Sequence, residues 1–167
     1  MTLWLVGMMG SGKTSAGRLA ADRLGVPFLD IDDQLAIGNG TSVPELWDEL
    51  GERGFRRLER AEIEKIAGTE AIVSTGGGAV LDRANRQQMK DSGTVVWLKA
   101  APAVLGGRLD TGTGRPLLDD HPDREARLAG LLDERSRAYG DAADYEIDTS
   151  TLSVEEVAKR IEGLWRP

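Results

Sequence analysis

Residues 7–14 read Gly-Met-Met-Gly-Ser-Gly-Lys-Thr, which completes the G-x-x-x-x-G-K-[ST] pattern of a phosphate-binding loop. An apolar run at residues 3–6 precedes the loop and a helical pattern begins at Lys13, so the strand–loop–helix context is present. Glycines let backbone N–H groups turn toward phosphate oxygens, and the positive end of the following helix faces the same oxygens. Lys13 suits the β- and γ-phosphates, and the Thr14 hydroxyl suits Mg²⁺. A chance Gly-rich turn is the alternative, but the motif predicts that the chain binds a nucleoside triphosphate.

Two carboxylates, Asp30 and Asp32, end the second apolar run of the chain. If this run is a strand, its alternation places both side chains on one side, next to the phosphate loop. One carboxylate suits Mg²⁺ held through its water shell, and the other suits hydrogen bonds from a substrate hydroxyl. Acidic residues after a strand are also ordinary helix caps, a part open to Asp33. The neighbouring phosphate loop favours the functional interpretation.

Arg56 and Glu59 lie three residues apart in a helical pattern, so they share one helix face and can pair. A solvated ion pair is the ordinary expectation, and it would contribute little to stability. The functional interpretation has Glu59 orienting Arg56 onto an anionic group of the substrate.

Three successive glycines at residues 76–78 give up all side-chain packing. A turn needs only one or two glycines. The three glycines therefore predict a backbone that approaches a ligand closely.

A polar, Gly-rich loop around residues 111–118 contains Arg115. This composition is typical of a mobile lid that brings an arginine to a transferring phosphoryl group, and equally of an exposed loop. Arg108 comes shortly before the loop, and Arg135 lies on the long helix predicted after it. His121, the one histidine, is expected to be a surface residue. Apolar patterns predict core packing for the four tryptophans, Trp4, Trp47, Trp97 and Trp165.

Short apolar runs alternate with helical patterns along the chain. The apolar runs predict strands at residues 3–6, 27–30, 71–74, 94–98 and 145–148. The helical patterns predict helices at residues 13–24, 44–67 (capped by Ser42 and broken at Gly51 and Gly54), about 81–90, 102–109, 123–139 and 154–164. Such alternation predicts an α/β fold with a parallel sheet covered on both faces and ligands at the carboxyl ends of its strands.

The bulk composition is that of a globular protein, with 40% hydrophobic and 29% charged residues among 167. A formal net charge of −7 argues against nucleic acid as the main partner, because binding a phosphate backbone needs excess positive charge. Arginine outnumbers lysine by 16 to 5, which favours anionic ligands. The lack of cysteine excludes disulfides and thiol catalysis. Without a leader, a membrane-length apolar run or a large exposed apolar stripe, we expect a soluble, cytoplasmic monomer that does not bind a membrane.

Together these motifs resemble those of one family, the shikimate kinases. The resemblance covers about residues 3–163 and rests on motifs in the family's order: the phosphate loop at 7–14, Asp30-Ile31-Asp32, Gly51-Glu52-x-x-Phe55-Arg56-x-x-Glu59, Ser-Thr-Gly-Gly-Gly-Ala-Val at 74–80, Arg115-Pro116-Leu117-Leu118 and the helix with Arg135 and Tyr139. It implies a P-loop three-layer sandwich with a five-stranded parallel sheet, substrate-binding helices and a mobile lid. It also implies one domain over residues 1–167, with a substrate-binding region at about 32–62 and a lid at about 109–120.

The resemblance implies an enzyme that transfers the γ-phosphoryl group of ATP to the 3-hydroxyl of shikimate with Mg²⁺, a step toward chorismate and the aromatic amino acids. Lys13, Asp32 and Arg115 would be its catalytic residues. Thr14 would bind Mg²⁺, with Asp30 helping through water. The implied shikimate site is Asp32, Arg56, Gly77, Gly78 and Arg135. The implied ATP site is Met9, Gly10, Ser11, Gly12, Lys13, Thr14, Arg108 and Arg115, with Arg108 flanking the adenine.

One departure from the family pattern concerns the adenine. Residues 148–151 contain no arginine where some relatives place one against the base, so a preference for ATP over GTP stays open. A kinase of the same fold that acts on another polyol, such as gluconate, is an alternative function, because gluconate also carries a carboxylate. A non-catalytic nucleotide-binding regulator is a third. Such a regulator would be expected to have lost Lys13, Asp32 or Arg115, and all three are present.

Overall fold

Five parallel strands form the sheet of the computed structural model, which describes residues 1–109 and 123–166. The sheet has the order β2-β3-β1-β4-β5, in which β1 pairs with both β3 and β4. Successive strands are therefore added on both sides of β1, and this reversal opens a crevice at the carboxyl ends of the strands. The predicted apolar runs form these strands, with bounds Thr2–Val6 (β1), Phe28–Asp30 (β2), Ile72–Ser74 (β3), Gly93–Lys99 (β4) and Tyr145–Asp148 (β5).

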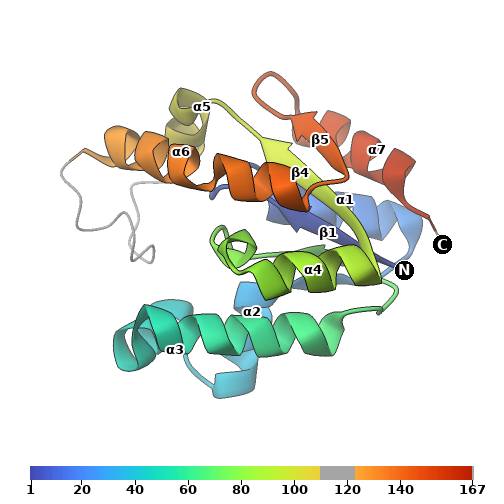
Figure 1. Cartoon of the computed structure of the whole chain (residues 1–167). Coiled ribbons are helices and arrows are strands. Elements are labelled where there is room, and N and C mark those ends of the chain that lie inside the picture. Colours follow the sequence, from blue (N-terminus) through green and yellow to red (C-terminus); the bar gives the residue numbers. More distant parts are fainter. Residues whose placement is uncertain (110–122, 167) are drawn as a thin grey trace.

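Helices cover both faces of the sheet, as predicted for a three-layer α/β sandwich (Figure 1). Alternation along β1 separates the two faces. Leu3 and Leu5 pack with α1 and α7, whereas Trp4 and Val6 belong to the larger buried cluster with α3, α4 and α6. In the described part of the chain, no helix has both the length and the apolar character to cross a membrane. The helices are α1 (Lys13–Leu24), α2 (Ile31–Asn39), α3 (Val43–Ile66), the 3-10 turn η1 (Ala79–Leu81), α4 (Arg83–Ser92), α5 (Pro102–Arg108), α6 (Arg124–Ala142) and α7 (Val154–Leu164).

Helix α2, which the sequence patterns do not predict, begins directly after β2. Asp30 is its N-cap, because the Asp30 carboxylate accepts a hydrogen bond from the backbone N–H of Asp32 at 3.1 Å. Asp32 therefore lies in the first turn of a helix and does not alternate with Asp30 along a strand, so that prediction is wrong. Asp33 lies in the same turn and is not the cap. Both Asp30 and Asp32 still reach the carboxyl edge of the sheet, because the helix starts where the strand ends.

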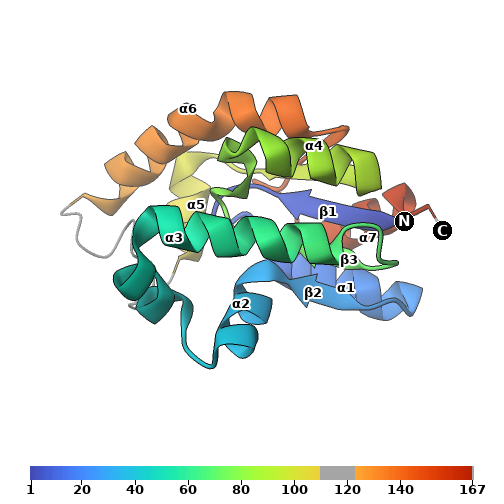
Figure 2. The ribbon, with the colours of Figure 1, turned by 60° about the horizontal axis from the view of Figure 1, so that its bottom comes forward.

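Helix α3 contains the predicted break at one of two glycines. Gly51 has a φ of 64° and a ψ of 173°, which kinks the helix, whereas Gly54 is helical and buried. The predicted cap Ser42 forms a capping box with Glu45. Helices α2 and α3 pack on one another beside the β2 edge of the sheet (Figure 2). This pair makes up most of the region that the sequence resemblance predicts to bind the substrate.

Most of the predicted lid lies outside the described residues. Leu109 ends the first described range, and the rest of the predicted lid at 109–120 comes after it. Arg115 and His121 therefore also lie outside the described residues. The delivery of Arg115 by a lid stays a prediction of the sequence, as does the surface position of His121.

Candidate active site

The phosphate loop connects β1 to α1 at the carboxyl edge of the sheet. Gly7, Gly10 and Gly12 have φ values of 144°, 79° and 94°, a region that residues with side chains rarely adopt. Lys13 folds back over the loop, and its ammonium donates hydrogen bonds to two loop carbonyls at 2.8 and 3.0 Å. The buried hydroxyl of Ser11 has no hydrogen-bond partner among the described residues. The loop thus has the curled backbone of an anion site and a polar group suited to a phosphate oxygen.

Thr14 and Asp30 place two oxygen groups beside the phosphate loop. The Thr14 hydroxyl donates a hydrogen bond to the Asp30 carboxylate at 2.9 Å. Mg²⁺ prefers oxygen ligands, keeps several waters and commonly uses one or two protein groups together with substrate phosphates. The chemistry and spacing of this pair therefore fit the predicted arrangement, in which Thr14 holds Mg²⁺ and Asp30 assists through water.

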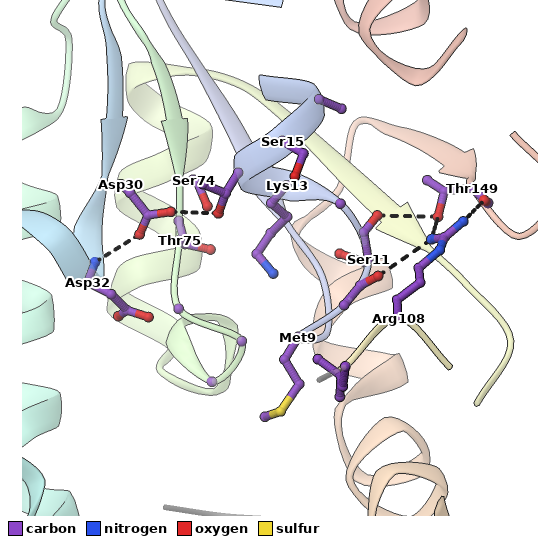
Figure 3. Close-up of a pocket in the computed structure, with 18 of the residues that line it drawn as sticks. Met9, Ser11, Lys13, Ser15, Asp30, Asp32, Ser74, Thr75, Arg108 and Thr149 are labelled. Carbon is purple, nitrogen blue, oxygen red and sulfur yellow. Dashed lines mark hydrogen bonds between the residues drawn. The ribbon is translucent and has the colours of Figure 1, made fainter. Parts of the chain in front are cut away.

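Asp32 lines the same hollow as Lys13 and Asp30 (Figure 3). Burial raises the pKa of Asp32 from its ordinary 3.8 to about 6, and the negative charge of Asp30 adds to this rise. The positive charges of Lys13 and Arg56 act in the opposite direction on the same pKa. A carboxylate with this pKa is ionised at pH 7 yet basic enough to accept a proton from a reacting hydroxyl.

Glu59 and Arg56 form the predicted ion pair, but not the solvated pair that such residues usually make. The Glu59 side chain is 0% exposed, and it accepts a hydrogen bond from the Arg56 guanidinium at 2.7 Å. Burial raises the pKa of Glu59, while the charge and the hydrogen bond of Arg56 lower it. Because Arg56 also lines the cavity, the buried carboxylate holds this guanidinium at the cavity wall.

Trp47 forms part of the cavity wall, so core packing describes only part of its role. The guanidinium carbon of Arg56 lies 5.4 Å from the centre of the Trp47 ring and 5.6 Å from that of Phe55. Cation–π attraction to these two rings adds to the support of Arg56. Trp4 and Trp97 are buried as predicted. Trp47 and Phe55 were not predicted to line a site, because an apolar helical pattern does not distinguish a cavity wall from a core.

The three glycines after β3 pack against charged side chains of the protein itself. A Cβ atom at Gly76 would lie 2.6 Å from Oε1 of Glu59 and 3.3 Å from Oδ1 of Asp32. At Gly78, a Cβ atom would overlap the Arg56 guanidinium. The segment therefore approaches side chains of the site closely, whereas its predicted approach to a ligand stays a prediction. Glycine is needed at Gly76 and Gly78 because any larger residue there would displace these side chains.

Arg135 reaches the same cavity from α6. It is 3% exposed, and its Nη1 lies 4.0 Å from Sδ of Met8. A Cβ atom at Gly77 would lie 3.4 Å from this Nη1. The buried Nε of Arg135 has no hydrogen-bond partner within the described ranges. A buried guanidinium with an unused donor suits an anionic ligand, and Arg56 lines the same cavity.

Arg108 and Thr149 lie across the phosphate loop from Asp32 (Figure 3). The Arg108 guanidinium donates hydrogen bonds to Oγ1 of Thr149 at 2.9 Å and to its backbone carbonyl at 2.5 Å. It also reaches the carbonyl of Gly10 at 3.5 Å. Thr149 was not among the predicted site residues, although its position directly after the last predicted strand, at the ligand-binding edge, was a usable signal. Residues 148–151, which lack an arginine beside the adenine position, thus supply a threonine that holds Arg108.

One cavity, of about 920 Å³, lies at the carboxyl ends of the strands and is lined by the predicted site residues that the structure describes. Arg115 is the one predicted site residue outside the described ranges. The predicted site residues that line the cavity are Met9, Gly10, Ser11, Gly12, Lys13, Thr14, Asp30, Asp32, Arg56, Gly77, Gly78, Arg108 and Arg135.

A phosphate loop at the carboxyl edge of a 2-3-1-4-5 parallel sheet, with a buried acid and arginines in the same cavity, defines a P-loop kinase, an ATP-dependent phosphotransferase. The family model for shikimate kinase matches residues 9–164 of this chain. The chain belongs to the shikimate kinase family.

Relatives and solved structures match the chain over nearly its whole length. A shikimate kinase from Symbiobacterium thermophilum is 42% identical over 165 residues, which cover 96% of this chain and 94% of the relative. One from Cupriavidus pinatubonensis is 41% identical and covers 95% of this chain and 83% of the relative. The structure of shikimate kinase from Acinetobacter baumannii in complex with shikimate has a TM-score of 0.91 at 35% identity, covering 96% and 89% of the two chains. A gluconokinase from Sinorhizobium meliloti, with a TM-score of 0.62 at 20% identity over 97% and 89%, shares the fold alone.

Proposed function

We propose that this protein transfers the γ-phosphoryl group of ATP to the 3-hydroxyl of shikimate in the presence of Mg²⁺, giving shikimate 3-phosphate. The observation that carries the proposal is that Asp32, Arg56 and Arg135 line one cavity with the phosphate loop. Membership of the family supports ATP as the phosphoryl donor. The relative whose structure contains shikimate supports this acceptor.

The polar groups of shikimate match those of the cavity. Shikimate carries one carboxylate and three hydroxyls on a ring. Arg56 and Arg135 offer planar guanidinium groups to the carboxylate, and the backbone N–H groups of Gly77 and Gly78 offer further donors. Asp32 accepts hydrogen bonds from ring hydroxyls and takes the proton of the attacking hydroxyl. In this proposal Asp32 orients the acceptor and serves as the general base.

Phosphoryl transfer depends on positioning and on charge stabilisation, so it needs no covalent nucleophile from the protein. We assign Lys13 and the loop amides of residues 9–12 to the phosphates of ATP. Thr14, with Asp30 acting through water, would hold Mg²⁺, which neutralises charge on the phosphate oxygens when it is bound. The loop thereby aligns the γ-phosphoryl group with the acceptor hydroxyl held by Asp32.

Two further arginines complete the proposed site. Arg108 would flank the adenine from its position beside Thr149. Arg115, which lies outside the described residues, would close with the lid onto the phosphates, as its motif predicts. We also propose that the enzyme works as a cytoplasmic monomer with one kinase domain.

A coupled ADP-release assay with ATP and Mg²⁺ tests the function by comparing shikimate, gluconate and quinate as acceptors. We expect saturable turnover on shikimate alone and its loss in Asp32→Asn. Turnover on gluconate instead would contradict the assigned acceptor and leave a kinase of the same fold. ATP binding without turnover on any of the three acceptors would favour a non-catalytic regulator.

A further inference from the structure

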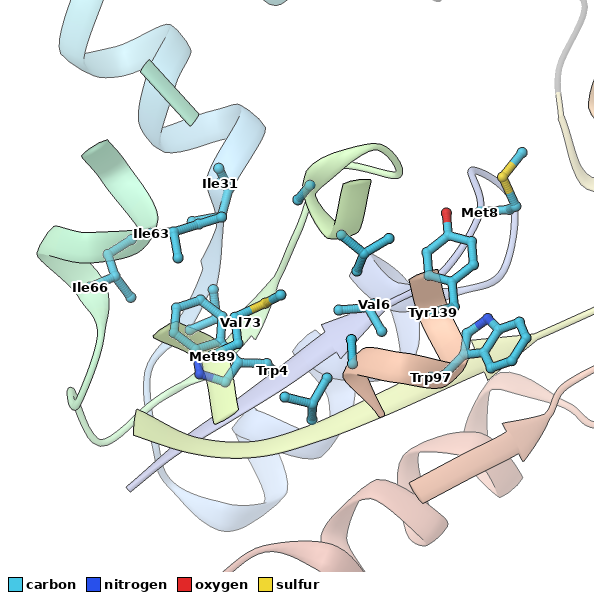
Figure 4. Close-up of a cluster of buried hydrophobic side chains, with 14 of the residues drawn as sticks. Trp4, Val6, Met8, Ile31, Ile63, Ile66, Val73, Met89, Trp97 and Tyr139 are labelled. Atoms are coloured by element: carbon cyan, nitrogen blue, oxygen red, sulfur yellow. The ribbon is translucent and has the colours of Figure 1, made fainter. Parts of the chain in front are cut away.

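Tyr139 is a buried polar residue that the proposed mechanism does not use. It is 0% exposed, and its ring stacks on that of Trp97 with a centre-to-centre distance of 5.3 Å and an interplanar angle of 22° (Figure 4). Its hydroxyl donates a hydrogen bond to the backbone carbonyl of Gly77 at 2.5 Å. Burial raises the pKa of Tyr139 to about 12, so the phenol stays a neutral donor at working pH. A core helix is thus tied directly to the triple-glycine segment.

The hydrogen bond from Tyr139 fixes one peptide unit. The carbonyl of Gly77 and the N–H of Gly78 belong to the same trans peptide, so they point in opposite directions. Gly77 and Gly78 line the cavity, whereas Tyr139 lies behind them in the core. A carbonyl held toward Tyr139 therefore turns the Gly78 N–H away from the core. This N–H makes no hydrogen bond with any residue that the structure describes, so it is available to a ligand.

Tyr139 also lies next to Arg135. The two residues are four apart on α6 and therefore share one helix face. The positive charge of Arg135 acts on the Tyr139 phenol, so the two groups are close. Nη1 of Arg135 in turn lies next to Gly77, at 3.4 Å from the position of its missing Cβ. One phenol thus lies close to a guanidinium assigned to the substrate and binds the carbonyl of the peptide unit whose N–H is assigned to it.

We propose that Tyr139 is a positioning residue for shikimate: its hydroxyl orients the Gly77–Gly78 peptide so that the Gly78 N–H faces the cavity, beside Arg135. This inference rests on the proposed function and extends it to a residue behind the cavity wall. Tyr139 does not touch the substrate. It acts by presetting a donor that would otherwise be free to rotate with its flexible glycine peptide.

Tyr139→Phe tests the inference, because it removes the hydroxyl and keeps the ring that stacks on Trp97. We expect the KM for shikimate to rise about tenfold, as for loss of a buried hydrogen bond, and the KM for ATP to stay within about twofold. Ser92→Ala is the matched control. It removes a hydrogen bond that Trp4 donates to Ser92 at 3.1 Å, away from the cavity-lining residues, and should leave both KM values unchanged.

The kinetic outcomes separate the two proposals. If wild-type protein does not phosphorylate shikimate, the proposed function fails before Tyr139 is tested. If wild-type protein does so and Tyr139→Phe shows an unchanged KM for shikimate, the positioning role is overturned even where thermal stability falls. Equal rises in both KM values would also overturn it, because they indicate general damage to the fold.

A second measurement keeps the native fold and does not depend on Tyr139→Phe. The chain has two tyrosines, and Tyr145 is 49% exposed, so Tyr145→Phe leaves Tyr139 as the single site for 3-fluorotyrosine labelling. We expect the ¹⁹F resonance of Tyr139 to shift on saturation with shikimate alone and to shift less with ATP alone. A resonance that does not respond to bound shikimate would overturn the inference.

Discussion

Asp32 combines the burial that raises its pKa with the proposed role of general base, and this combination sets a pH dependence. Because its pKa is raised to about 6, Asp32 takes up a proton as the pH falls through 6. A protonated carboxyl cannot accept the proton of the attacking hydroxyl. We therefore expect kcat/KM for shikimate to fall about tenfold per pH unit below about pH 6. Initial rates across pH 4.5–8 measure this, and a profile that stays flat to pH 5 would contradict it.

The same burial makes the ionised form of Asp32 costly for stability. The native state keeps this proton up to about pH 6, whereas the unfolded chain releases it near 3.8. The free energy of unfolding therefore falls as the pH rises from 3.8 to about 6, and the whole of this loss of stability is present at pH 7. Asp32→Asn removes the charge, so it should raise the free energy of unfolding at pH 7 by about 1–3 kcal/mol while abolishing turnover.

Urea unfolding of the ligand-free protein at pH 7 and pH 4 checks this gain in stability. At pH 4 the wild-type carboxyl is largely protonated in the native state, so Asp32→Asn should differ little from wild type there. A variant that is less stable than wild type at pH 7 would show that Asp32 stabilises the empty site through Lys13 and Arg56, against the direction inferred from its pKa.

The triple-glycine segment and α3 must fit together without side chains between them. Gly78 has a φ of −100° and a ψ of −3°, which any residue can adopt, so backbone strain is not the reason for glycine. Gly78→Ala would instead push on the Arg56 guanidinium. We expect the KM for shikimate to rise roughly tenfold with little change in the KM for ATP, as steady-state kinetics can measure.

A second Gly→Ala substitution serves as the control for Gly78→Ala. Gly140 lies on the exposed side of α6, and a Cβ atom there would meet nothing within 4 Å. Gly140→Ala should leave both KM values unchanged and raise the free energy of unfolding by about 0.5–1 kcal/mol, because alanine favours a helix interior. Similar kinetics for the two variants would argue against a specific clash with Arg56.

The end of β5 and the end of α5 meet through Arg108 and Thr149. Thr149→Val keeps the shape of the side chain but removes the oxygen that accepts the hydrogen bond from Arg108 at 2.9 Å. We expect the KM for ATP to rise at least about tenfold, because the variant loses a hydrogen bond to a charged group as well as the one that the Thr149 hydroxyl donates to the Lys99 carbonyl at 3.0 Å. The KM for shikimate should hold. Thr149→Ser retains the hydroxyl and should restore the wild-type KM for ATP. Equal effects of the valine and serine variants would contradict a role for this hydroxyl.

At the scale of the whole molecule, the exposed apolar surface predicts a monomer. No described helix or strand carries more than one large exposed hydrophobic residue, so none of them presents an apolar stripe. These residues are Ile37 on α2, Leu50 on α3, Leu81 on η1, Tyr145 on β5 and Val154 on α7. Stable interfaces need contiguous apolar cores. Size-exclusion chromatography with light scattering should therefore give a mass near 18.0 kDa, and twice that mass would contradict the prediction.

Much of the fold could be predicted because its signals are local. The strands follow from short continuous apolar runs, and most helix bounds follow from period-3.6 patterns, each within a single segment. Helix α2 was not predicted because β2 leads into it without a break, so Asp32 was assigned to a strand. The break at Gly51 was predictable from the presence of a glycine in the helical pattern. The helical geometry of Gly54 depends instead on its neighbours in the packed helix.

The sequence by itself determined the phosphate loop and the parallel α/β sheet, because consecutive motifs at strand ends must meet at one edge of such a sheet. Through the resemblance to one family it also determined most of the charged residues that line the cavity. Only the tertiary structure decided that Glu59 is fully buried under Arg56, that Thr149 holds Arg108, and that Tyr139 holds the triple-glycine segment. Burial and long-range hydrogen bonds depend on which elements pack together. That choice is made by contacts between segments far apart in the chain, and no local pattern records it.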